Sequence, residues 1–139
     1  MSAAAAEQRN SYKGSPSRPW CRVILIGEGS AADAMELLAD TGNPCAIVVS
    51  VAAMSRFKRG DGPDVSTNFG PLNGGWLRVA IPELGFGEVI LGYASDAVAD
   101  AARASSPDFQ GLIGLPLLRM NEYGGDAESF WVRKNAKPV

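Results

Sequence analysis

The sequence predicts a mainly β domain, because short runs of apolar and β-branched residues alternate with glycine-rich turns. The 16 glycines among 139 residues favour turns and hairpins over a helical bundle. Asn73-Gly74-Gly75 predicts a tight hairpin, since these residues readily adopt the positive φ angles that such turns need. We therefore expect one all-β domain over residues 20–139, long enough to bury a single core.

The expected elements follow these runs in chain order. Strands are expected at 22–27, 46–50, 65–69, 76–81, 88–93, 111–114 and 129–133. A short helix is expected at 115–120, whereas residues 51–57 and 96–103 fit either a helix or a loop. Residues 60–64 are expected to form a loop, and residues 1–19, which contain several breakers, a disordered tail.

Residues 30–40 allow two interpretations. As a helix capped by Ser30, they would follow a Gly27-Glu28-Gly29 turn in a small α/β domain that binds a nucleotide or a partner protein. As a strand, Met35 to Ala39 would run directly into Asp40. Local propensity favours the helix, and the segments described below favour the strand.

Composition restricts the chemistry that the chain can perform. It contains no histidine, which excludes Ser-His-Asp and Cys-His catalytic pairs and histidine-rich zinc sites within the chain. Acid–base work therefore depends mainly on Asp and Glu. A net charge of −2 gives no broad basic field, so we expect neither nucleic-acid nor membrane binding.

The two cysteines, Cys21 and Cys45, each open an apolar run and are expected to be small buried hydrophobic residues. A redox switch on a dimer is the alternative. The N-terminus has no long apolar segment typical of a secretory signal, so we expect a cytoplasmic, reduced protein.

Asp40-Thr41-Gly42 follows an apolar run, and Leu112-Ile113-Gly114 with Leu117-Leu118 lies further along the chain. In this order and at this separation, the two segments resemble the signature segments of the retropepsin-like aspartic proteases. The resemblance covers roughly residues 20–133. It implies a closed barrel of short strands with a flap hairpin and one short C-terminal helix.

The resemblance also implies a mechanism. Asp40 would be the catalytic carboxylate, Thr41 would fix the turn by bonding to the partner chain, and Gly42 would supply an N–H toward the carboxylate. Because only one such segment is present, two chains must form a homodimer, in which two carboxylates share one proton and one water. We expect an aspartic endopeptidase that cleaves extended, largely apolar peptides without a metal or organic cofactor.

The residues 70–76 lie where a retropepsin flap would be and are expected to close over the substrate. The resemblance assigns substrate binding to Gly70, Leu72, Gly74, Gly75, Trp76, Leu112, Ile113 and Gly114.

The chain departs from the family at Asn43-Pro44, where a small residue usually follows the glycine, and at Leu115-Pro116, where an Arg-Asp or Arg-Asn pair is usual. A second hypothesis is therefore a catalytically silent module that keeps the protease fold and dimerises or holds peptides.

Overall fold

The computed structural model describes residues 6–68 and 70–135 and is mainly β, with 53% strand and 17% helix. The strands are β1 (Glu7–Ser11), β2 (Trp20–Ile26), β3 (Ala32–Asp40), β4 (Ile47–Val49), β5 (Asp61–Thr67), β6 (Gly70–Ile81), β7 (Phe86–Ala94), β8 (Phe109–Gly114), β9 (Glu122–Gly125) and β10 (Ser129–Arg133). The helices are α1 (Val51–Phe57), α2 (Asp96–Arg103) and α3 (Leu115–Leu118), with a 3₁₀ turn at Pro82–Leu84. None of these helices is long and apolar enough to span a bilayer.

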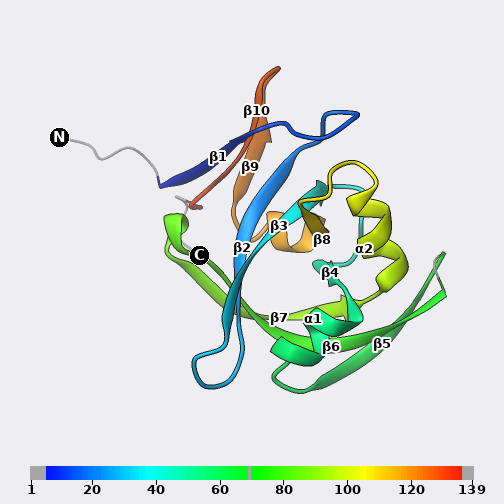
Figure 1. Cartoon of the computed structure of the whole chain (residues 1–139). Helices are drawn as coiled ribbons and strands as arrows, with labels where there is room; N and C mark the ends of the chain where they lie inside the picture. The colour runs from blue at the N-terminus through cyan, green and yellow to red at the C-terminus, as the bar shows by residue number, and fades with distance from the viewer. Residues whose placement is uncertain (1–5, 69, 136–139) are drawn as a thin grey trace.

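Six strands close into a barrel, which Figure 1 shows in the centre of the molecule. They pair in the order β2, β3, β8, β4, β7 and β6, and β6 pairs back onto β2. The predicted mainly β fold with a closed barrel is therefore confirmed. Strand β5 extends the sheet beyond the barrel by pairing with β6.

Alternating side chains fill the barrel. In β2, Cys21, Val23 and Leu25 are fully buried, whereas Arg22 between them is exposed. The same alternation in the last part of β6 places Leu77, Val79 and Ile81 in the core. Burying each such side chain contributes roughly 1.5–3 kcal/mol, which makes this core the main source of stability.

Strand β3 confirms the strand interpretation of residues 30–40, because Met35, Leu37 and Ala39 point into the core with a period of two. Strands β2 and β3 form an antiparallel hairpin whose turn contains Gly27 and Gly29. The alternative βαβ unit is therefore wrong for this segment.

Strand β8 lies between β3 and β4, although β3 and β4 are consecutive in the chain. It pairs parallel to β3, with Ile113 beside Ala39 and Gly114 beside Asp40, and antiparallel to β4. A Cβ atom at Gly114 would lie 1.8 Å from the Cys45 carbonyl oxygen, and one at Gly111 would lie 2.1 Å from that of Val48. Glycine therefore lets β8 fit between its neighbours.

The expected tail over residues 1–19 differs from the structure. Strand β1 pairs with β10, and β10 pairs with β9, in a small second sheet at the top of Figure 1. The Gln8 amide joins this sheet to the barrel, because its oxygen accepts from the Arg22 N–H at 2.7 Å and its nitrogen donates to the Arg22 carbonyl at 2.9 Å. Because the polar residue Gln8 anchors β1, the pattern of apolar residues could not predict that residues 7–11 form a strand. Residues 1–5 lie outside the described residues.

Two further expectations are corrected. The predicted single helix is α3, but α1 and α2 are also helical, each with a serine N-cap, Ser50 and Ser95. The expected loop at 60–64 belongs mostly to β5, whose partner strand β6 is glycine-rich where the two meet.

We predict that Gly114→Ala destabilises the fold by about 3 kcal/mol or more, near the upper end for overpacking, because the added methyl group would meet the backbone of the Asp40–Cys45 loop. Chemical denaturation measures the loss. Gly87→Ala in β7 is the control, since nothing lies within 4 Å of its Cβ position. Equal stability of the two variants would contradict the close packing of β8.

Candidate active site

Asp40 is the last residue of β3, and the chain turns sharply after it. The Asp40 carbonyl accepts a hydrogen bond from the Asn43 N–H at 3.1 Å, which closes a β-turn. The Asp40 Oδ1 accepts from the Gly42 N–H at 3.1 Å, so the carboxylate is fixed by its own turn. Asp40, Thr41 and Gly42 are exposed, and Asp40 has no ion-pair partner among residues 6–68 and 70–135.

Asn43 ties this turn to the end of β8. Its side-chain Oδ1 accepts from the Cys45 N–H at 2.9 Å, and its carbonyl accepts from the Leu115 N–H at 3.1 Å. The Gly114 N–H donates to the Ala46 carbonyl at 2.8 Å. The loop from Asp40 to β4 therefore wraps the end of β8, which holds the carboxylate in place through backbone contacts.

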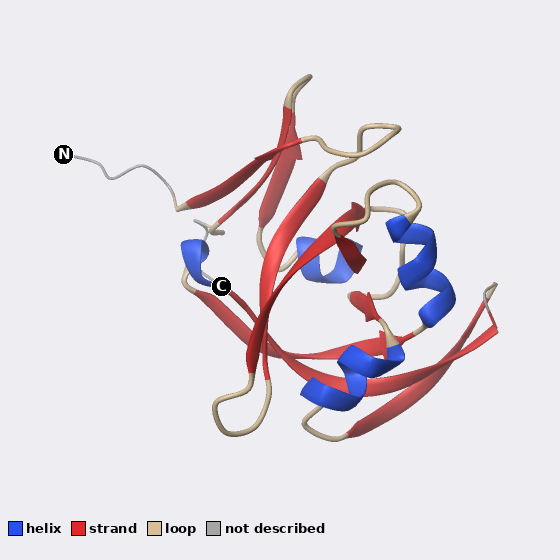
Figure 2. Ribbon diagram, in the orientation of Figure 1, coloured by secondary structure: helices blue, strands red, loops and turns tan. Residues whose placement is uncertain are grey.

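A cleft of about 800 Å³ opens beside Asp40. Its walls come from the Asp40–Cys45 loop, the end of the β5–β6 hairpin and one face of α2. Figure 2 shows α2 and the end of this hairpin on the same side of the barrel. The lining is largely apolar, and Arg18 and Asp40 are the charged side chains among its described residues.

The structure brings together part of the predicted site. Asp40, Thr41 and Gly42 line the cleft together with Leu72 and Leu112. Gly70, Gly74, Gly75, Trp76, Ile113 and Gly114 are not among the lining residues. Ile113 is fully buried in the barrel, and Trp76 lies on the surface with 39% of its area exposed.

The turn of the β5–β6 hairpin is not at Asn73-Gly74-Gly75, so that prediction is wrong. Gly74 lies within β6, opposite Gly62 on one side and Tyr93 on the other. The chain reverses between Thr67 and Gly70, and Gly70 has the positive φ of +89°. Glycine serves at Gly75 for a different reason, since a Cβ there would lie 2.5 Å from the Met54 sulfur.

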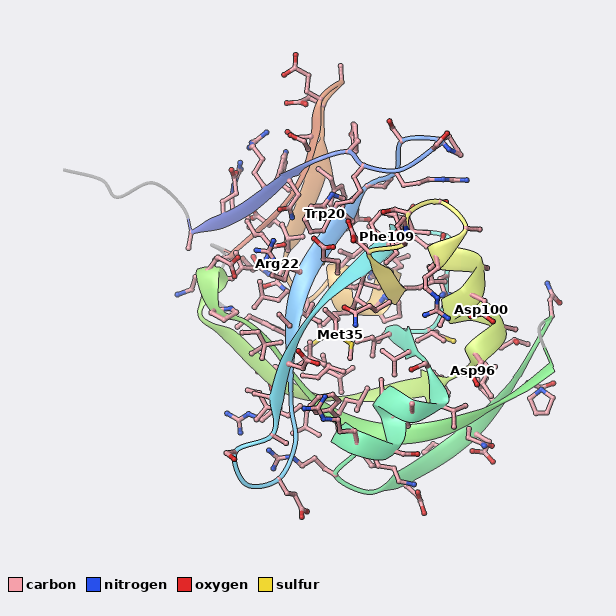
Figure 3. All side chains as sticks on the ribbon, in the orientation of Figure 1. Trp20, Arg22, Met35, Asp96, Asp100 and Phe109 are labelled. Carbon is pink, nitrogen blue, oxygen red and sulfur yellow. The ribbon has the colours of Figure 1, made fainter. Side chains whose placement is uncertain are left out.

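Sequence reasoning missed the α2 wall of the cleft, made by Val98, Ala101 and Ala102. Ala102 packs against Trp20 and Phe109, which lie close together in Figure 3. The amphipathic pattern of residues 96–103 predicts a buried face, but not which face of α2 borders the cleft.

Both thiols are free and buried, as predicted for small hydrophobic residues. Burial raises the pKa of the Cys21 thiol to about 12, and the nearby Glu83 carboxylate adds to the shift. Burial also raises the pKa of the Cys45 thiol, which lies in the wall of the cleft. Both thiols are therefore protonated at neutral pH, which makes them poor nucleophiles.

Within the described part of the chain, no group of three His, Cys, Asp or Glu side chains could hold a metal ion. A scan against models of protein families, a search of curated proteins and a search of solved structures gave no significant match to this chain.

Proposed function

We propose that the protein is an aspartic endopeptidase of the retropepsin type, active as a homodimer in which two Asp40 side chains meet. The observation that carries the proposal is the position of Asp40: an exposed, unpaired carboxylate at the end of β3, braced by β8 and bordering a peptide-sized cleft. Its exposure leaves this carboxylate accessible to water and to a second chain.

Two further observations support this proposal. The Thr41 hydroxyl has no hydrogen-bond partner in the described part of its own chain, and both Thr41 and Gly42 are exposed. These residues are therefore free to contact a second copy across a two-fold axis, where Asp40 would meet its equivalent. The end of the β5–β6 hairpin borders the same cleft, in the position expected of a flap.

The proposed reaction needs one ionised and one protonated carboxylate. The ionised Asp40 takes a proton from a water molecule while the water oxygen attacks the carbonyl carbon of the peptide bond. The protonated Asp40 of the second chain donates its proton to the carbonyl oxygen. As the C–N bond breaks, the first Asp40 gives the proton it took from water to the leaving nitrogen, and the ionised Asp40 of the second chain takes a proton from a hydroxyl group of the intermediate. This step releases an amine and a carboxylic acid and returns both Asp40 side chains to their starting protonation states. Two identical side chains differ in this reaction only through the shared proton.

The second candidate is a silent peptide-binding module. Asn43 is the specific reason to consider it, because this residue replaces the small residue that usually follows the glycine. Its side chain closes the loop behind Asp40 rather than approaching the carboxylate, since it accepts from the Cys45 N–H. Asn43 therefore has a structural role in this loop, and the cleavage measurement below decides between the enzyme and the silent module.

We predict that Asp40→Asn lowers the cleavage rate by about 10²–10⁴-fold, the range expected for the loss of acid–base catalysis. Stability should change little, because the amide oxygen can still accept from Gly42. The measurement is digestion of a peptide library between acid and neutral pH, where the parent protein should give a bell-shaped profile.

Asp33→Asn on the same strand is the control, since it removes only an exposed ion pair with Arg56. Cleavage that persists in Asp40→Asn would end the aspartic-protease proposal. Absence of cleavage by the parent at every pH would favour the silent module.

We also predict that Gly70→Ala impairs turnover more than stability. An alanine at a φ of +89° strains the turn of the hairpin, and this turn must move freely if the hairpin closes over substrate. Gly85→Ala is the matched control: it too has a positive φ, +65°, and open space around its Cβ position, but it lies before β7 and outside the β5–β6 hairpin. Equal turnover by the two variants would count against a moving flap.

A further inference from the structure

The charge distribution of the cleft is simple. Among its described lining residues only Arg18 and Asp40 are charged, and most of the others are apolar or small. Asp40 is assigned to chemistry under the proposed function. Arg18 is left as a single positive charge in an otherwise neutral wall.

Arg18 lies on a firmly anchored turn. Its N–H donates to the Lys13 carbonyl at 2.8 Å, and its carbonyl accepts from the Lys13 N–H at 3.1 Å. The adjacent Pro19 carbonyl accepts from the Ala39 N–H at 2.9 Å, one residue before Asp40. On the other side, the Ser15 N–H donates to the Ser105 carbonyl beyond α2. These bonds fix the Arg18 backbone relative to both Asp40 and the α2 wall.

The carboxylates near this turn are already occupied by another cation. The Lys13 ammonium pairs with Glu36 at 2.8 Å and approaches Asp108 at 3.5 Å, and it lies 4.0 Å from the centre of the Trp20 ring. Arg18 has no ion pair within residues 6–68 and 70–135, and it is exposed to solvent. Its guanidinium is therefore available to a ligand in the cleft.

We infer that Arg18 is a specificity-determining residue that receives a carboxylate of the bound peptide. A guanidinium presents a planar fork of donors that matches a carboxylate in two parallel hydrogen bonds. Arg18 is the one cationic side chain among the described lining residues, so a carboxylate should bind preferentially at this place in the cleft. This inference rests on the proposed use of the cleft for peptides. The carboxylate is either an acidic side chain or the C-terminus of the ligand.

Peptide binding to the Asp40→Asn protein tests the inference without requiring cleavage. The probes are apolar decapeptides in which a single Glu, Gln or Lys is moved along the sequence, each made with an amidated and with a free C-terminus. We expect Glu to bind about fivefold more tightly than Gln at one position, and the difference to shrink as salt rises. If Arg18 instead binds the C-terminal carboxylate, peptides with a free C-terminus should bind about fivefold more tightly than the same peptides with an amidated C-terminus.

Arg18→Glu should remove this preference and favour Lys at the same position. Arg78→Glu is the matched control, because Arg78 is also exposed and has no ion pair among the described residues but does not line the cleft. A preference for acid that survives Arg18→Glu would overturn the inference, as would equal binding of all probes or no binding. If the parent protein cleaves no peptide but its preference for an acidic ligand still depends on Arg18, the result would contradict the proposed enzyme and support the inference.

Discussion

The position of β8 between β3 and β4 is the constraint on which the barrel and the cleft depend. Consecutive strands usually lie side by side, but here a strand that begins 69 residues after Asp40 separates them. The backbone groups of β3 and β4 that face the interior of the sheet are satisfied only when β8 is in place. Gly111 and Gly114 permit the close approach, and the Asp40–Cys45 loop then wraps the end of β8. The carboxylate of Asp40 is thus positioned by long-range contacts and not by its local sequence alone.

Much of the barrel could be predicted from the sequence, because its strands are short runs of apolar and β-branched residues separated by glycine-rich turns. The difficult segment was β3, whose alanines and Leu38 also fit a helix. Tertiary packing decides this case, since Met35, Leu37 and Ala39 fill the barrel only from an extended chain. The anchoring of β1 could not be predicted, because the side chain that docks it to the barrel is the polar Gln8. The hairpin turn was misplaced because glycine serves two purposes: at Gly70 it provides positive φ, whereas at Gly74 and Gly75 it provides room.

The candidate site was only partly visible in the sequence. Asp40, Thr41 and Gly42 stand together in one segment, and their local hydrogen bonds follow from turn chemistry. The rest of the cleft is assembled from distant segments: the turn before β2, the β5–β6 hairpin and α2. Nothing in the local pattern around Arg18 or Ala101 indicates that it borders the same space as Asp40. Such neighbours follow from the closure of the barrel, which sets the distance between these segments.

The central claim is that each active site needs two Asp40 carboxylates from two chains. The most direct measurement mixes the parent protein with increasing amounts of Asp40→Asn at constant total concentration, after exchange of subunits. Because mixed dimers would have only one ionisable carboxylate, activity should fall as the square of the parent fraction. A linear fall, with each parent chain keeping its full rate, would contradict the claim.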